Sequence, residues 1–191
     1  MRLSKNQYVK CVADRLSKFH HVNLDNIPDM DLYMDQLIKF MDEELDGIGS
    51  EQPLTSNMVN NYIKNKILPN TNKKKYTKDH IIIITLIYYF KNVLSIIEIK
   101  TILDPIIKKY FSNKNKLEMV YIQLFKKKKK YLNKNFKDFM EKVMDAEELF
   151  DDEYLKLFSI ISTLSFDIYV KKVILKELIA LYKKNEQSIE K

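Results

Sequence analysis

The sequence predicts an all-α fold. Only 2 glycines and 4 prolines occur among its 191 residues, and both residue types are needed at turns and at the corners of sheets. The residues that take their place, mainly Lys, Leu, Ile, Met and Glu, mostly favour helices. Apolar residues make up 46% of the chain and recur at helical rather than alternating spacing. We therefore expect long helices around a buried core, for which the chain is long enough.

Two helices separated by a loop are predicted near the N-terminus. Apolar spacing indicates helices over residues 3–20 and 31–45, with a loop around Pro28 between them. Gly47 follows the second helix, where it can serve as the C-cap. Four aspartates of the second helix share a polar face, namely Asp31, Asp35, Asp42 and Asp46. Because this cluster has no histidine and no ordered loop spacing, we interpret it as a solvated face rather than a metal site.

Three further helices are predicted in the middle of the chain, after a short linker at residues 50–54. They cover residues 56–65, 78–93 and 96–111. Each is preceded by a hydroxyl residue that can cap its first turn, namely Thr55, Thr77 and Ser95. A polar, basic segment at residues 70–76 joins the first of these helices to the second. Pro105 lies inside the third, where it can kink the helix.

Two long helices are predicted in the C-terminal part, over residues 115–146 and 152–184, with an acidic turn between them. Five consecutive lysines at residues 126–130 surround the first helix, so we interpret them as a solvated extension; contact with an anionic surface is the alternative. The second helix carries a heptad seam, formed by Leu157, Ile161, Leu164, Ile168, Lys171, Leu175, Leu178 and Tyr182. Such a seam is typical of helix pairing, but further apolar residues widen the stripe and favour a bundle.

The composition argues against several classes of protein. Cys11 is the single cysteine, so no internal disulfide is possible, which fits a reducing compartment such as the cytoplasm. No apolar run approaches the roughly 20 residues of a membrane span, and the N-terminus lacks the apolar region of a signal peptide. Neither metal-ligand spacing, a glycine-rich phosphate loop nor a catalytic pair is present. We expect a cytoplasmic protein that is not an enzyme and that uses no metal, cofactor or membrane.

Charge is distributed unevenly along the chain. The net charge is +7, but residues 21–52 carry nine acids and one lysine, whereas residues 53–80 carry six lysines and one acid. A basic excess attracts polyanions such as nucleic acid. The abundance of Lys, Asn, Ile and Tyr is also what an AT-rich genome encodes, so charge alone does not decide between these explanations.

Residues 54–103 carry the strongest indication of function. The helix over residues 56–65 presents a polar side made of Ser56, Asn57, Asn60, Asn61 and Lys64. Asparagine amides can read adenine in the major groove. The following loop contains Lys73, Lys74 and Lys75 and is closed by Tyr76, and its lysines can meet phosphates. A short capped helix beside a basic loop, held by two apolar helices, is what a winged helix-turn-helix needs.

The same residues resemble two protein families. The runs Leu54-Thr55-Ser56, Ile67-Leu68-Pro69, Lys74-Lys75-Tyr76-Thr77 and Leu94-Ser95 with Glu98-Ile99 resemble the DNA-binding domain of the MerR family. More closely, Thr55, Tyr62, Lys64, Pro69, Lys73, Lys74, Tyr76 and Thr77 match the pattern of a small uncharacterised bacterial family, the YkrK-like family (domain of unknown function 1836). The sequence departs from the MerR pattern at Asn60-Asn61-Tyr62, where an Arg-Tyr-Tyr run is usual, and at Lys66, where glycine is usual.

The MerR resemblance implies a winged helix-turn-helix segment embedded in a helical bundle. We expect N-terminal helices at residues 1–49, the DNA-binding segment at 50–111, and a C-terminal helical hairpin at 112–191 for dimerisation or sensing. The expected function is a transcriptional regulator that binds double-stranded DNA as a homodimer; its effector is not indicated. The expected DNA-binding residues are Thr55, Ser56, Asn57, Asn60, Asn61, Lys64, Lys73, Lys74, Lys75 and Tyr76. The alternative is a protein-interaction adaptor that has lost DNA binding, if the acidic helix covers the recognition helix.

Overall fold

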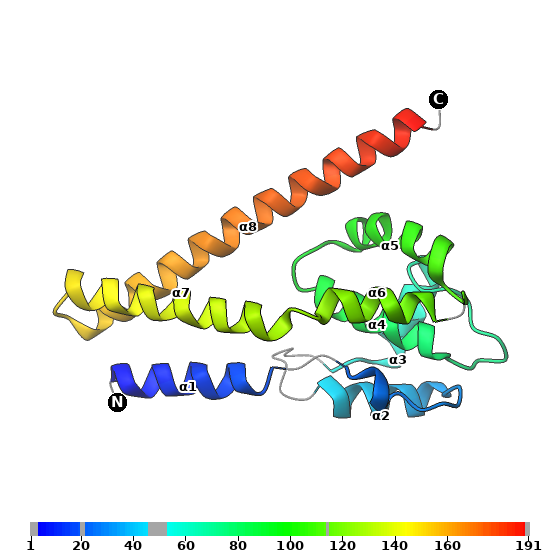
Figure 1. Ribbon diagram of the computed structural model, residues 1–191, viewed down its shortest axis with the longest axis horizontal. Helices are drawn as coiled ribbons and strands as arrows, with labels where there is room; N and C mark the ends of the chain where they lie inside the picture. Colours follow the sequence, from blue (N-terminus) through cyan, green and yellow to red (C-terminus); the bar gives the residue numbers. More distant parts are fainter. Residues whose placement is uncertain (1–3, 20–21, 46–52, 114, 190–191) are drawn as a thin grey trace. The chain divides into compact units, whose positions relative to one another are not determined.

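The computed structural model confirms the all-α prediction (Figure 1). It describes residues 4–19, 22–45, 53–113 and 115–189. Within these ranges the helices are α1 (Lys5–Ser17), η1 (Leu24–Asn26), α2 (Met34–Leu45), α3 (Ser56–Lys64), α4 (Lys78–Phe90), α5 (Ile96–Tyr110), α6 (Lys116–Phe125), α7 (Lys128–Leu149) and α8 (Glu153–Ile189). The predicted C-cap at Gly47, the neighbouring Asp46 and the first part of the predicted linker lie outside the described residues.

The chain divides into two compact units. The central unit is His20–Phe125, and the terminal unit combines Met1–Phe19 with Lys126–Lys191. This division differs from the three segments expected from the sequence. Helix α2 belongs with α3 because the two pack together, and α1 belongs with the C-terminal helices because it packs on α7.

Helix α4 forms the core of the central unit. Every residue from 81 to 88 is buried, and a helix that is apolar all round is stable only when other elements cover it on all sides. Helix α6 packs against it, and the ammonium group of Lys78 lies 3.0 Å from a carboxylate oxygen of Glu118. The buried Tyr121 hydroxyl donates to the Val22 carbonyl at 2.8 Å, which ties α6 to the segment before η1. Helix α5 continues through Pro105 without interruption.

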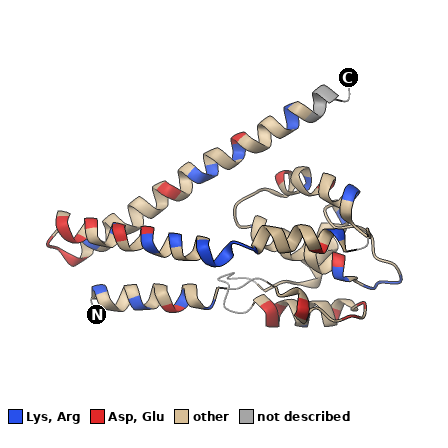
Figure 2. Ribbon diagram, in the orientation of Figure 1, with Lys and Arg blue, Asp and Glu red and all other residues tan. Residues whose placement is uncertain are grey.

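The lysine run divides one predicted helix into two. Helix α6 ends at Phe125 and α7 begins at Lys128, so the prediction of one continuous helix over residues 115–146 is wrong. Lysines three and four positions apart repel one another on a helix surface. The run also has no apolar side chains that could pack on a core, so a helix is poorly stabilised there. The boundary between the two units also falls at this point. Figure 2 shows the lysines at the start of α7.

The terminal unit is built on the antiparallel hairpin of α7 and α8, with α1 beside α7. Its buried core consists of Phe139, Val143, Ala146 and Ile160, against which Leu164 and residues of α1 pack. Two ion pairs join the hairpin, Lys142 with Asp167 at 2.8 Å and Lys156 with Glu147 at 3.1 Å. The predicted acidic turn is present, since Asp152 Oδ1 accepts from the backbone N–H of Tyr154 at 2.9 Å and caps α8.

Helix α8 leaves a broad apolar face exposed on the side opposite this core. Leu155, Phe158, Phe166, Tyr169 and Val173 are 42–65% exposed and fall within one side of the helix at about 100° per residue. We call these five residues the outer face of α8. Part of the predicted heptad seam is used within the chain instead, because Leu164 packs in the core. In the ranges that the structure describes, no helix has the length and apolar character to cross a membrane.

Candidate nucleic-acid interface

Helix α3 is a short, capped helix with one buried and one exposed side. The Thr55 hydroxyl oxygen accepts from the Met58 backbone N–H at 3.3 Å, which confirms the predicted cap. Val59 and Tyr62 are buried on the inner side, and burial raises the pKa of the Tyr62 hydroxyl. On the other side Asn57, Asn60, Asn61 and Lys64 are exposed, and Ser56 is half-buried.

The exposed side of α3 presents a row of polar groups at helical spacing. Positions 57, 60, 61 and 64 share one face, because residues three and four apart lie above one another. Asn61 is partly engaged, since its side-chain oxygen accepts from Asn65 Nδ2 at 2.8 Å. The outward groups that can meet a ligand directly are therefore Asn57, Asn60 and Lys64.

Helix α3 ends in a left-handed turn at Lys66. The Lys66 N–H donates to the Ile63 carbonyl at 2.9 Å, and the Ile67 N–H donates to the Tyr62 carbonyl at 2.9 Å. This pair of bonds is the Schellman motif, which usually places glycine at the left-handed position. Lys66 takes that position with a φ of 56°. The turn therefore forms with lysine where the MerR pattern usually has glycine, although the left-handed conformation costs a lysine more backbone energy than a glycine.

A tight lysine-tipped turn follows, which we call the lysine hairpin (residues 72–75). The Lys75 N–H donates to the Asn72 carbonyl at 2.9 Å. Lys73 and Lys74 between them have φ values of 49° and 60°. Positive φ at both central residues is the signature of a type I′ hairpin turn, for which Asn-Gly is the preferred pair. Both lysine side chains are exposed at the tip.

The lysine hairpin is anchored to the segment before α2. The backbones of Leu32 and Tyr76 exchange hydrogen bonds of 2.9 and 2.7 Å. The ammonium group of Lys75 lies 5.3 Å from the centre of the Tyr33 ring, a cation–π distance. Lys75 is thus drawn back onto the domain, while Lys73 and Lys74 extend from it.

Tyr76 is the predicted DNA-binding residue that the structure buries. Its side chain is only 3% exposed and meets the His80 ring edge-on, with centroids 5.8 Å apart. An aromatic residue at the base of a hairpin gains more from core packing than from solvent exposure. Tyr76 therefore supports the hairpin from inside, and the outward surface is formed mainly by Asn57, Asn60, Lys64, Lys73 and Lys74.

His80 completes the base of the hairpin and was not expected from the sequence to matter. The Thr77 N–H donates to His80 Nδ1 at 3.1 Å, so His80 takes the place that Glu or Gln occupies in a capping box. Its ring also meets Phe111, with centroids 4.9 Å apart. Burial lowers the pKa of His80, although the carbonyls of Asn70 and Pro69 and the carboxylates of Asp79 and Asp31 oppose the shift.

Acidic residues of α2 lie beside the start of α3. Asp35, Asp42 and Glu43 line a shallow depression together with Lys39 and Ser56. The ammonium group of Lys39 lies 3.9 Å from a carboxylate oxygen of Glu43, so a mainly acidic side of α2 borders the N-terminal end of α3. Figure 2 shows acids on α2 and lysines in the loop between α3 and α4. The polar surface of the central unit is therefore divided, with acids near Ser56 and cations towards Lys64 and the lysine hairpin.

Among the described residues no group of His, Cys, Asp and Glu side chains is placed to hold a metal ion. The arrangement therefore offers hydrogen bonds and positive charge to a ligand, from α3 and from the lysine hairpin.

Comparison with known proteins identifies one family. A family described as "Domain of unknown function (DUF1836)" matches residues 22–124, which is almost the whole of the central unit. No curated protein matches the chain, and no solved structure does so. The matched region contains α3, the lysine hairpin and the helices that support them.

Proposed function

The chain belongs to the DUF1836 family, and we propose that it is a DNA-binding transcriptional regulator of the winged helix-turn-helix type. In this proposal α3 lies in the major groove and the lysine hairpin is the wing. The observation that carries the proposal is that an exposed row of Asn57, Asn60 and Lys64 and the exposed tip lysines belong to one compact unit. Amides that read base edges and ammonium groups that meet phosphates are the two components of a DNA-binding surface.

The dimensions of α3 suit the major groove. With its side chains an α-helix is about 10–12 Å in diameter, which fits a groove about 12 Å wide, and the 9 residues of α3 give it about two and a half turns. Its outer side is made of asparagines and a lysine, which can donate to or accept from base edges. Its inner side is held by Val59 and Tyr62, both buried, so the helix is presented from a rigid core.

The backbone of the lysine hairpin supports a function for its charge. Lys73 and Lys74 occupy left-handed positions, where a residue with a Cβ costs about 1 kcal/mol relative to glycine. Non-glycine residues held in such conformations tend to cluster at functional sites. Ammonium groups projecting from the tip would reach the phosphates that flank the groove.

The test is binding to fluorescent duplex DNA from the promoter of the protein's own gene, measured by anisotropy at two salt concentrations against random duplex. The informative variant is Lys73→Gln with Lys74→Gln. Its control is Lys108→Gln with Lys109→Gln, which removes the same charge from exposed lysines at the end of α5.

Loss of the tip lysines should weaken binding on all sequences alike. The slope of log affinity against log salt should become less steep by about 0.9 for each lost phosphate contact. The control variant should bind like the unmodified protein. Equal binding by the hairpin variant would refute its assignment as a wing.

A second candidate is a protein-interaction adaptor, and the acids beside Ser56 favour it. Asp35, Asp42 and Glu43 would repel phosphates that approach the first turn of α3. On this alternative the unmodified protein should fail to bind duplex DNA even at low salt. If the protein binds DNA, Asp42→Asn with Glu43→Gln should tighten that binding by relieving the repulsion.

We also propose that the regulator is a cytoplasmic homodimer joined through the outer face of α8. A helix of 37 residues extends for about 55 Å, and its outer face exposes five large apolar side chains. Large contiguous apolar patches on the surface of a soluble protein mark interaction sites. A dimer would carry two central units, which is the number that a regulator reading two half-sites requires.

A further inference from the structure

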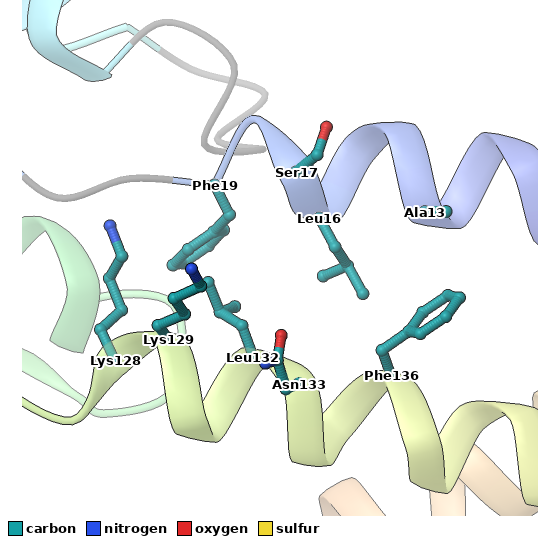
Figure 3. Close-up of a pocket in the computed structure, with 9 residues that line it drawn as sticks. All are labelled: Ala13, Leu16, Ser17, Phe19, Lys128, Lys129, Leu132, Asn133 and Phe136. Carbon is teal, nitrogen blue, oxygen red and sulfur yellow. The ribbon is translucent and has the colours of Figure 1, made fainter.

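The terminal unit contains an apolar pocket between α1 and α7 (Figure 3). Its volume is about 440 Å³, within the range of about 300–1,000 Å³ that is usual for small-molecule sites. The apolar part of its lining comes from both helices and from Phe19, two residues beyond the end of α1, and consists of Ala13, Leu16, Phe19, Leu132 and Phe136. Most of these side chains are half-buried, so the pocket is open to solvent along one side.

Cations gather at one end of this pocket. Figure 3 shows the ammonium groups of Lys128 and Lys129 at the Phe19 end, whereas Leu16 and Phe136 project into the pocket farther along. Ser17 and Asn133 add polar groups to the lining. Burial lowers the pKa of Lys128, because burial disfavours the charged ammonium group. Among the described residues, none that lines the pocket carries a carboxylate.

We propose that this pocket binds an anionic amphiphile, of the class of a medium-chain carboxylic acid. The carboxylate would lie between Lys128 and Lys129, and the alkyl chain would extend along Leu16, Leu132 and Phe136. An apolar cavity with a few polar groups at one end suits a ligand that has a polar head at one end and an apolar chain along the rest of its length. The proposal does not depend on DNA binding, because the pocket belongs to the terminal unit and the DNA-binding surface to the central unit.

The test is isothermal titration calorimetry of the full chain with decanoate, below its micelle concentration. The chemical controls are octanoate, decanol and decyltrimethylammonium. The informative variant is Lys128→Gln with Lys129→Gln. Its matched control is Lys126→Gln with Lys127→Gln, which removes the same charge from the same lysine run at positions that do not line the pocket. Circular dichroism shows whether each variant keeps its helices.

Decanoate should bind saturably and more tightly than octanoate, by about fourfold for each methylene that becomes buried. The Lys128 and Lys129 variant should bind it roughly tenfold more weakly, since a charge-assisted contact is lost, while the control variant should match the unmodified protein. The proposal is overturned if decanoate does not saturate, if decanol or the cationic amphiphile binds equally well, or if both lysine variants lose the same affinity.

Discussion

His80 shows how one buried side chain can make the stability of this domain depend on pH. It accepts from the Thr77 N–H through a nitrogen that must be unprotonated to do so. Burial lowers its pKa from the ordinary value of 6.5, so the unfolded chain binds a proton more readily than the folded chain. Its contribution to stability is therefore present above about pH 6.5 and is lost as the pH falls through the lower, folded-state pKa.

We predict that His80→Gln reduces this pH dependence. Glutamine at the third position of the helix can keep the capping bond to Thr77, but it does not titrate. The free energy of unfolding should be measured by urea denaturation between pH 7.5 and pH 5 for both proteins. The unmodified protein should lose more stability on acidification than the variant does. Parallel pH profiles would show that His80 does not titrate on unfolding.

The tip of the lysine hairpin combines a backbone cost with a surface charge. We predict that Lys73→Asn with Lys74→Gly stabilises the protein by about 1 kcal/mol, because Asn-Gly is the preferred type I′ pair. Binding to DNA should weaken as it does in the Gln variant, because the same two charges are lost. Thermal or urea unfolding measures the first effect and anisotropy the second. The Gln variant, which keeps the backbone cost, should show no gain in stability.

At the scale of the element, α3 depends on its cap more than a longer helix would. Its 9 residues are fewer than the roughly 12 needed for a helix to be stable alone, so it relies on packing and on Thr55. We predict that Thr55→Ala lowers the free energy of unfolding by about 1 kcal/mol, whereas Thr55→Ser is nearly neutral. Urea denaturation measures both variants. Equal stability of the Ala and Ser variants would show that the hydroxyl contributes nothing.

The break between α6 and α7 also belongs to this scale. Apolar spacing is continuous enough on either side of the lysine run to suggest one helix, yet the chain changes from one compact unit to the other there. Lys126 and Lys127 fall between the two helices. Charge repulsion alone costs only a few tenths of a kcal/mol per pair, so the interruption also reflects the lack of apolar side chains in the run.

At the scale of the whole molecule, the described residues leave the outer face of α8 largely exposed. A stable interface buries roughly 800 Å² from each partner, and large apolar side chains spread along a helix of this length can supply that area. We predict that sedimentation equilibrium at micromolar concentration shows a dimer, and that Phe158→Gln with Tyr169→Gln shifts it to monomer. Lys134→Gln with Lys137→Gln, at exposed positions of α7 away from this face, is the control. A monomeric unmodified protein would contradict the proposed pairing.

The local features of the central unit could be predicted from the sequence. The positions of α3, α4 and α5 and the caps at Thr55, Thr77 and Ser95 depend on residues a few positions apart, which interact whatever the rest of the chain does. The polar side of α3 follows from the same periodicity. Whether this side binds DNA remains a proposal.

Only the tertiary structure determined which side chains are available for function. Tyr76 is buried and Lys75 turns back onto Tyr33 because the hairpin pairs with Leu32, a residue far away in the sequence. The grouping of α1 with α7 and α8, and the pocket that it creates, likewise depend on contacts between the two ends of the chain. Hydrophobic burial is non-directional, so an apolar pattern identifies a face that must be covered but does not identify what covers it.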